Sequence, residues 1–138
     1  MRRKTLLVVI CMMTALLLLA GCSKEKKQKG IEGTWVLFEE YDKDGTRVSP
    51  DELKEIGISE KYEIKGTKAV YTCEMKGASK PIEFDLDMEV LGDNKYCFKM
   101  AGKIVFPADE VILDGDLLTY EVGTVEDNNY MKMVFKRQ

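Results

Sequence analysis

The sequence predicts an all-β domain, an antiparallel up-and-down β-barrel with one short helix after its first strand. Three features of residues 31–138 support this fold class: short segments rich in aromatic and β-branched residues, turn signals between them, and alternation of apolar with charged side chains. A sheet with one apolar face must close into a barrel or pack as two layers, because an open sheet would expose that face and its edges. A β-sandwich is the alternative architecture.

The first strand is predicted over Gly33–Tyr41, where aromatic and β-branched residues are frequent. A helix follows, because Ser49 can act as its N-cap, Pro50 suits the first helical position, and Glu52 completes a capping box. Gly57 is the expected end of this helix. Turn signals then separate eight further predicted strands, over residues 60–65, 68–76, 81–91, 95–100, 103–106, 109–114, 117–122 and 130–137.

Residues 82–90 show the alternation most clearly, because every apolar side chain falls on one face and every acidic side chain on the other. We expect this strand to be half buried. The dipeptide Asp114-Gly115 is typical of a two-residue hairpin turn between two of the later strands. The same parity assigns further side chains to the barrel interior: Tyr71, Cys73, Met75, Tyr96, Phe98, Met100, Met131, Met133 and Phe135.

The N-terminus has the organisation of an export signal. Arg2, Arg3 and Lys4 form a basic cluster, and residues 6–20 contain no charged side chain. This apolar run is shorter than the ~20 residues that a transmembrane helix needs. Residues 1–21 are therefore predicted to be a signal peptide.

The segment Leu19-Ala20-Gly21-Cys22 resembles the lipobox of bacterial lipoproteins. That resemblance implies cleavage before Cys22 and a thioether between its thiol and diacylglycerol. Two acyl chains anchor a protein firmly, since each buried methylene contributes ~0.8 kcal/mol and one chain alone binds only marginally. We expect a lipid-anchored protein on the extracytoplasmic face of the cell membrane; an ordinary secretory cleavage site with an incidental cysteine is the alternative.

Residues 22–30 are predicted to be a flexible basic tether that begins at the lipidated Cys22, since four lysines and a single glutamate leave nothing to build a core. These lysines could lie against anionic headgroups, or the tether could be a solvated spacer. From Gly30 onward acidic side chains outnumber basic ones, which argues against nucleic acid as a partner. We expect the mature protein to be a monomer.

Gly33-Thr34-Trp35 resembles the G-x-W signature of lipocalins and of the lipocalin-like domains found in many bacterial lipoproteins. The resemblance implies that Trp35 closes one end of the barrel and packs near a basic residue at the end of the last strand. Arg137 is the candidate, because it shares parity with Met133 and Phe135. The helix after the first strand departs from the lipocalin pattern, in which the main helix follows the barrel strands.

Two functions are compatible with such a domain. The first is a binding module for a small apolar ligand held inside the barrel. The alternative is an envelope protein-interaction or scaffold module with a filled barrel core, and methionine, which adapts to irregular space, suits either a pocket or a filled core. The candidate ligand-binding residues are Tyr71, Met75, Phe84, Met88, Phe98, Met100 and Met133.

Catalysis is not expected. The chain has no histidine, which removes the commonest general base and the Ser-His-Asp arrangement, and no serine lies in a G-x-S-x-G motif. The acidic residues around Gly45 have some of the spacing of a calcium loop, but Pro50 and Arg47 occupy positions that such a loop does not allow. We therefore expect no cofactor and no metal site, and read this segment as an Asp-Gly turn.

Cys73 and Cys97 are a candidate disulfide, because an exported protein reaches an oxidising compartment. Strand parity argues against the bridge. It places Cys73 with the inward side chains and Cys97 with the outward ones.

Overall fold

The computed structural model describes residues 30–138; the predicted signal peptide, Cys22 and the rest of the tether before Gly30 lie outside them. Among the described residues, no helix has the length and apolar character required to span a membrane. The elements in chain order are β1 (Gly33–Tyr41), β2 (Arg47–Val48), α2 (Pro50–Ile56), β3 (Ile58–Lys65), β4 (Lys68–Met75), β5 (Ile82–Gly92), β6 (Lys95–Met100), β7 (Ile104–Val105), β8 (Val111–Asp114), β9 (Leu117–Val122) and β10 (Met131–Arg137).

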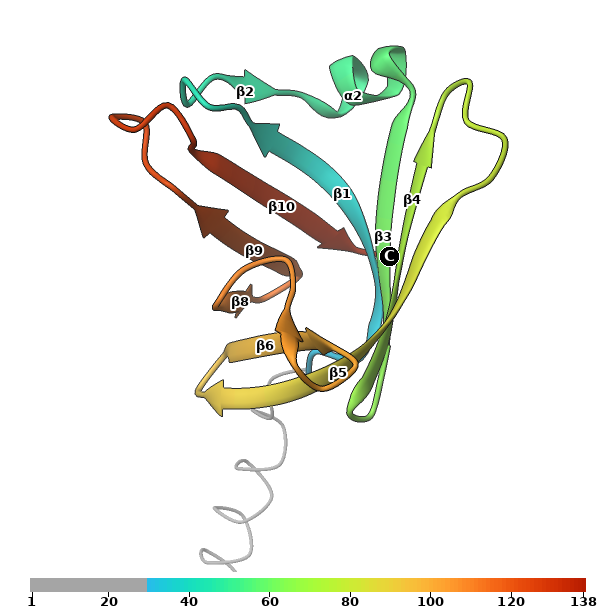
Figure 1. Cartoon of the computed structure of the whole chain (residues 1–138), viewed down its shortest axis with the longest axis vertical. Helices are drawn as coiled ribbons and strands as arrows, with labels where there is room; N and C mark the ends of the chain where they lie inside the picture. The colour runs from blue at the N-terminus through green and yellow to red at the C-terminus, as the bar shows by residue number, and fades with distance from the viewer. Residues whose placement is uncertain (1–29) are drawn as a thin grey trace, which may run out of the picture. The chain divides into compact units, whose positions relative to one another are not determined.

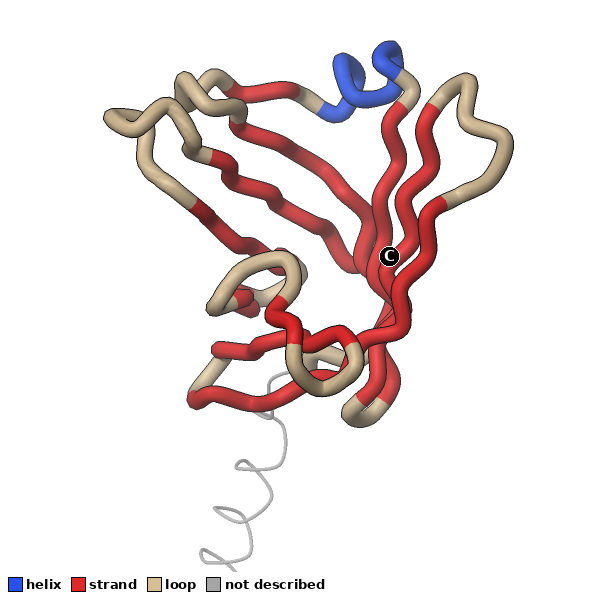
Figure 2. Tube along the Cα trace, in the orientation of Figure 1, coloured by secondary structure: helices blue, strands red, loops and turns tan. Residues whose placement is uncertain are grey.

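Eight of these strands form a closed antiparallel barrel. β1, β3, β4, β5, β6, β8, β9 and β10 pair in this order, and pairing of β10 with β1 closes the ring. Figures 1 and 2 show the strands running up and down around a common interior. The all-β barrel predicted from the sequence is therefore confirmed, and the β-sandwich is not formed.

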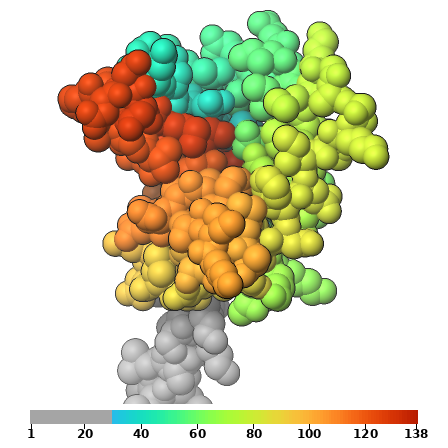
Figure 3. Space-filling model, in the orientation of Figure 1, coloured from blue at the N-terminus to red at the C-terminus, as the bar shows by residue number. Residues whose placement is uncertain are grey.

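The contact between β6 and β8 is the weakest part of the ring. Only two residue pairs join these strands, Lys95 with Ile112 and Tyr96 with Val111. The other half of β6 pairs instead with β7, which lies off the ring. The chain between β6 and β8 runs across the front of the barrel in Figure 1, and its orange atoms cover much of that face in Figure 3.

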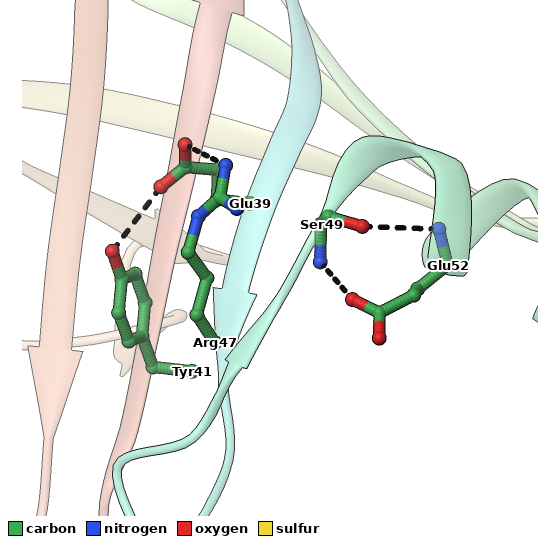
Figure 4. Close-up of polar contacts among 5 residues, drawn as sticks. All are labelled: Glu39, Tyr41, Arg47, Ser49 and Glu52. Atoms are coloured by element: carbon green, nitrogen blue, oxygen red, sulfur yellow. Dashed lines mark hydrogen bonds and ion pairs between the residues drawn. The ribbon is translucent and has the colours of Figure 1, made fainter.

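The predicted helix, α2, forms with the predicted caps. The Ser49 hydroxyl accepts a hydrogen bond from the Glu52 backbone N–H at 3.3 Å, and the Glu52 carboxylate accepts one from the Ser49 N–H at 2.7 Å (Figure 4). Gly57 ends the helix with a φ of 79°, in the left-handed region that favours glycine. α2 buries Leu53 and contacts β1 and β3 at one end of the barrel.

Aromatic side chains fill much of the interior. The Tyr62 ring is central: its centroid lies 5.1 Å from that of Tyr71, 5.4 Å from that of Phe98 and 5.0 Å from that of Phe135. These separations are typical of packed aromatic pairs. The predicted parity is confirmed on β5 as well, where Leu86 is buried and Asp85 is exposed.

The candidate disulfide between Cys73 and Cys97 is wrong, since both thiols are free and buried. The two residues lie on β4 and β6, on either side of β5, where Cys73 pairs with Ile82 and Cys97 with Glu89. Seven residues of strand separate these positions, roughly 23 Å at 3.3 Å per residue. A disulfide requires Cα atoms within about 7 Å, so the fold cannot form this one.

Two local details differ from the sequence prediction. The hairpin turn between β8 and β9 consists of Gly115 and Asp116 rather than Asp114 and Gly115, because Asp114 still pairs with Leu117. Gly115 has a φ of 58°, so the glycine takes the first turn position. The short strand β2 was not predicted.

Candidate binding site in the barrel interior

Trp35 closes one end of the barrel. Its side chain is fully buried, and its indole N–H donates a hydrogen bond to the Ile31 carbonyl at 2.8 Å. The Arg137 guanidinium lies 4.2 Å from the ring centroid of Trp35, and it donates a hydrogen bond to the Glu32 carbonyl at 2.7 Å. A Cβ at Gly33 would lie 3.3 Å from this guanidinium, so glycine leaves the room that Arg137 needs. The structure thus brings together all three motif residues.

The seven candidate ligand-binding residues do not share one environment. Tyr71, Phe98 and Met133 are buried in the core, whereas Phe84, Met88 and Met100 are half-buried and pack against it. Met75 does not belong with them, because its side chain is 46% exposed. The pairing of β4 with β5 ends at Cys73 and Ile82, so Met75 lies beyond the last pair and outside the core.

Apolar side chains on the inward face remain accessible at the α2 end. Ile82 lies on the same face of β5 as Phe84 and Leu86, and its side chain is 43% exposed. Inward-facing residues on other strands are only half-buried at this end. We call this region the mouth of the barrel, and its apolar residues are Leu37, Ile82, Phe84, Val122 and Met131.

Phe106, in the chain between β7 and β8, also enters the interior. Its ring centroid lies 5.0 Å from that of Tyr71 and 5.5 Å from that of Phe84. This part of the interior is filled by side chains. The inward-facing apolar side chains that stay partly exposed lie at the mouth.

A β-bulge in β1 separates two neighbouring glutamates. The register of β1 against β10 shifts between Leu37 and Glu39. As a result Glu39 points outward, where its carboxylate pairs with Arg47 at 2.7 Å and accepts a hydrogen bond from the Tyr41 hydroxyl at 3.2 Å (Figure 4). The hydrogen bond from Arg47 lowers the pKa of Glu39.

Glu40 has the opposite environment. It lies opposite Met133, a core residue, and so belongs to the inward face of the barrel. Burial raises the pKa of Glu40, and the nearby carboxylate of Asp42 raises it further. The two glutamates are adjacent in the sequence, but one is paired at the surface and the other is partly desolvated inside.

Glu60 is a second inward-facing carboxylate, because it shares parity on β3 with the buried Tyr62 and Ile64. Burial raises its pKa, contact with the Tyr71 hydroxyl partly offsets this, and the charge of Glu40 raises it again. Within residues 30–138, neither Glu40 nor Glu60 takes part in an ion pair. The sequence predicted neither residue as part of a site.

Two tyrosine hydroxyls lie in the same region. Burial raises the pKa of Tyr120, and the charges of Glu60 and Glu40 add to that effect. The Tyr62 hydroxyl is buried and has no hydrogen-bond partner among the described residues. Tyr120 is near enough to affect the pKa of Tyr62, but the two oxygens do not reach hydrogen-bond geometry. We call this group the interior polar cluster; it consists of Glu40, Glu60, Tyr62, Tyr71 and Tyr120.

The arrangement offers hydrogen-bond acceptors rather than a metal centre. In the part of the chain that the structure describes, no group of three or more His, Cys, Asp or Glu side chains could hold a metal ion. Burial raises the pKa of the Cys73 thiol, and the nearby Glu60 adds to this, so the thiol is not activated as a nucleophile.

The barrel also has a groove of about 830 Å³ along β8 and β9, and acidic side chains line much of it. This groove includes Asp109, Glu110, Asp114 and Glu121 together with Ile112. The lining also includes Thr119, Tyr120 and Val122, so the groove combines negative charge with apolar surface.

We expect Glu60→Gln to stabilise the protein at pH 7 by about 1 kcal/mol, a figure that allows for partial solvent screening. Because the folded-state pKa of Glu60 is raised, its contribution to stability is fully present below the ordinary value of 4.5 and is lost as the pH rises through the folded-state pKa. The gain should therefore shrink at pH 4. Denaturation midpoints at the two pH values measure it, with exposed Glu83→Gln as control; a loss of stability at pH 7 would contradict the buried, unpaired environment.

The sequence matches no protein-family model, and no curated protein matches it either. The function is therefore inferred from the sequence patterns and from the geometry of the barrel.

Proposed function

We propose that this chain is a membrane-anchored extracytoplasmic lipoprotein whose lipocalin-like barrel binds a small apolar ligand. The observation that carries the proposal is the mouth, where inward-facing apolar side chains such as Ile82 and Phe84 remain accessible. A concave apolar region with a few convergent polar groups is the usual form of a small-molecule site. Here the polar groups are those of the interior polar cluster.

The membrane anchor rests on the N-terminal segment, which lies outside the described residues. Leu19-Ala20-Gly21-Cys22 resembles a lipobox, and a basic cluster with an apolar run precedes it. A thioether-linked diacylglycerol on Cys22 would retain the domain at the membrane surface. The excess of acidic residues from Gly30 onward gives no basic face for nucleic acid.

A protein-interaction or scaffold module is the second candidate function. The aromatic packing around Tyr62 favours it, because these rings leave little room in the middle of the barrel. The acidic groove along β8 and β9 would then be the contact surface for an envelope protein. This function does not require an accessible mouth.

A titration with Nile red, an uncharged apolar dye, tests the proposal on the mature chain carrying Cys22→Ser, which has no acyl chains of its own. We expect saturation at one site per chain. Val122→Trp should abolish binding, because Val122 faces inward at the mouth and indole would fill it.

The matched control is Leu117→Trp, which places the same ring on the outer face of β9, the strand that also carries Val122; Leu117 is 37% exposed. Circular dichroism verifies that both variants keep the β-barrel. Binding that neither saturates nor responds to Val122→Trp would reject the interior site, and the protein-interaction function would then take its place.

A further inference from the structure

The acidic side chains inside the barrel lack the charged partners that several acidic side chains on its outer face have. On the outer face, Glu39 pairs with Arg47, Asp87 with Lys68 and Glu89 with Lys99. Inside the barrel, Glu40 and Glu60 have no such partner among the described residues. A desolvated carboxylate without a counter-charge lowers the stability of the fold, so a bound cation would supply the missing positive charge.

The Tyr62 hydroxyl is an independent second observation. Tyr62 is only 1% exposed, and its hydroxyl has no partner within residues 30–138. A buried polar group without a hydrogen bond costs stability, and phenylalanine would pack the same space without that cost. Tyr62 lies on the same inward face of β3 as Glu60, two residues along the strand. Burial raises the pKa of the Tyr62 hydroxyl, and Tyr120, Tyr71 and Glu60 add to that effect.

The interior polar cluster and the mouth both lie on the inward face of the barrel wall. Glu60 pairs across strands with Cys73, the residue that also pairs with Ile82 of the mouth. Tyr71, next on the inward face of β4, stacks on Phe84 at a ring-centroid distance of 5.9 Å. A molecule that enters between the apolar residues therefore meets acceptors that carry negative charge.

We propose, building on the ligand-binding function above, that the barrel takes an apolar molecule bearing a protonated amine. Its ammonium group donates hydrogen bonds to the Glu60 carboxylate and to the Tyr62 hydroxyl, and the Glu40 carboxylate adds a second negative charge. Hydrogen bonds between charged groups are stronger than neutral ones, and an ammonium has three donors to satisfy several acceptors. A fatty acid or another anionic amphiphile would be repelled by the same residues.

Calorimetric titration of the full lipid-anchored protein in phosphatidylcholine nanodiscs tests this proposal, with empty nanodiscs as the blank. The probes are 2-phenylethylamine, which is cationic at pH 7, and 2-phenylethanol, its neutral counterpart of nearly equal shape. We expect the amine to bind at one site and at least tenfold more tightly than the alcohol.

Two variants test which side chains bind the ammonium group. Glu60→Gln should weaken amine binding by tenfold or more and leave alcohol binding within about twofold. Tyr62→Phe should weaken amine binding severalfold, and it removes only the unpaired hydroxyl, so the fold is retained. Glu83→Gln, the same substitution at an exposed outer position, is the matched control and should change neither affinity.

The outcomes separate this inference from the function on which it rests. Equal binding of amine and alcohol, unaffected by Glu60→Gln, would overturn the amine specificity and leave the apolar site in place. Absence of binding by both probes, together with failure of the Nile red titration, would overturn the interior site itself. Amine binding that Glu60→Gln and Glu83→Gln weaken equally would assign it to general surface charge and would also overturn the inference.

Discussion

Trp35→Ala is expected to lower the free energy of unfolding by about 3–5 kcal/mol, the usual cost of truncating a buried large aromatic side chain. The indole is fully buried, hydrogen-bonded to the Ile31 carbonyl and covered by the Arg137 guanidinium. Its removal would leave a cavity at the closed end and would remove a cation–π contact. Urea denaturation followed by far-ultraviolet circular dichroism measures the effect without relying on tryptophan fluorescence.

Val36→Ala is the matched control for Trp35→Ala. Val36 is the next residue on β1, points to the outer face and is only half-buried, so its truncation should cost far less. Arg137→Gln should have an intermediate effect, because the indole stays buried while the guanidinium is lost. Equal midpoints for Trp35→Ala and the parent protein would show that the Trp35 end does not hold the barrel together.

Cys22→Ala is expected to abolish lipidation completely, because the thiol is the only group that can form the thioether. The protein should then no longer fractionate with membranes, since no acyl chain remains to hold it. Metabolic labelling with an alkyne fatty acid, followed by membrane fractionation, measures both effects.

Cys11→Ala provides the control, since it also removes one thiol near the N-terminus but leaves Cys22 intact. Its labelling should match that of the parent. Labelling of Cys22→Ala at the parent level would contradict the lipoprotein assignment and would direct the search for the anchor elsewhere.

The fold could be predicted largely because its signals are local. Alternation in β5 gave the buried face around Leu86, and the helix signals at Ser49 and Gly57 correspond to the caps observed. The lipocalin resemblance, carried by three residues, also indicated that Arg137 would lie over Trp35. Each of these depends on parity or on residues close together in the chain.

The interior polar cluster could be predicted only in part. Glu60 shares parity with Tyr62 and Ile64, so an inward carboxylate was visible in the alternation of residues 60–64. The inward position of Glu40 could not be predicted in this way, because uniform alternation from Trp35 would place Glu39 on the inward face instead. The β-bulge shifts the inward–outward alternation of β1 by one residue, and no turn or glycine marks it in the sequence.

Long-range geometry explains the other errors. Met75 shares parity with Tyr71, but parity does not say where a strand runs past its neighbour, and Met75 lies beyond the last pair of β4 with β5. Phe106 was missed because it belongs to a connection, yet the chain places its ring against Tyr71. Such contacts depend on barrel closure and not on local pattern.

The short β6–β8 contact has a consequence for the motions of the barrel. Local opening is cheapest where few backbone hydrogen bonds must break, and here two residue pairs hold the ring together, against eight between β3 and β4. Amide protons of Ile112 and its neighbours on β8 can therefore exchange with solvent through partial unfolding that leaves β3 and β4 intact. We therefore expect the line between β6 and β8 to open in a sub-global fluctuation, at a lower free energy than global unfolding.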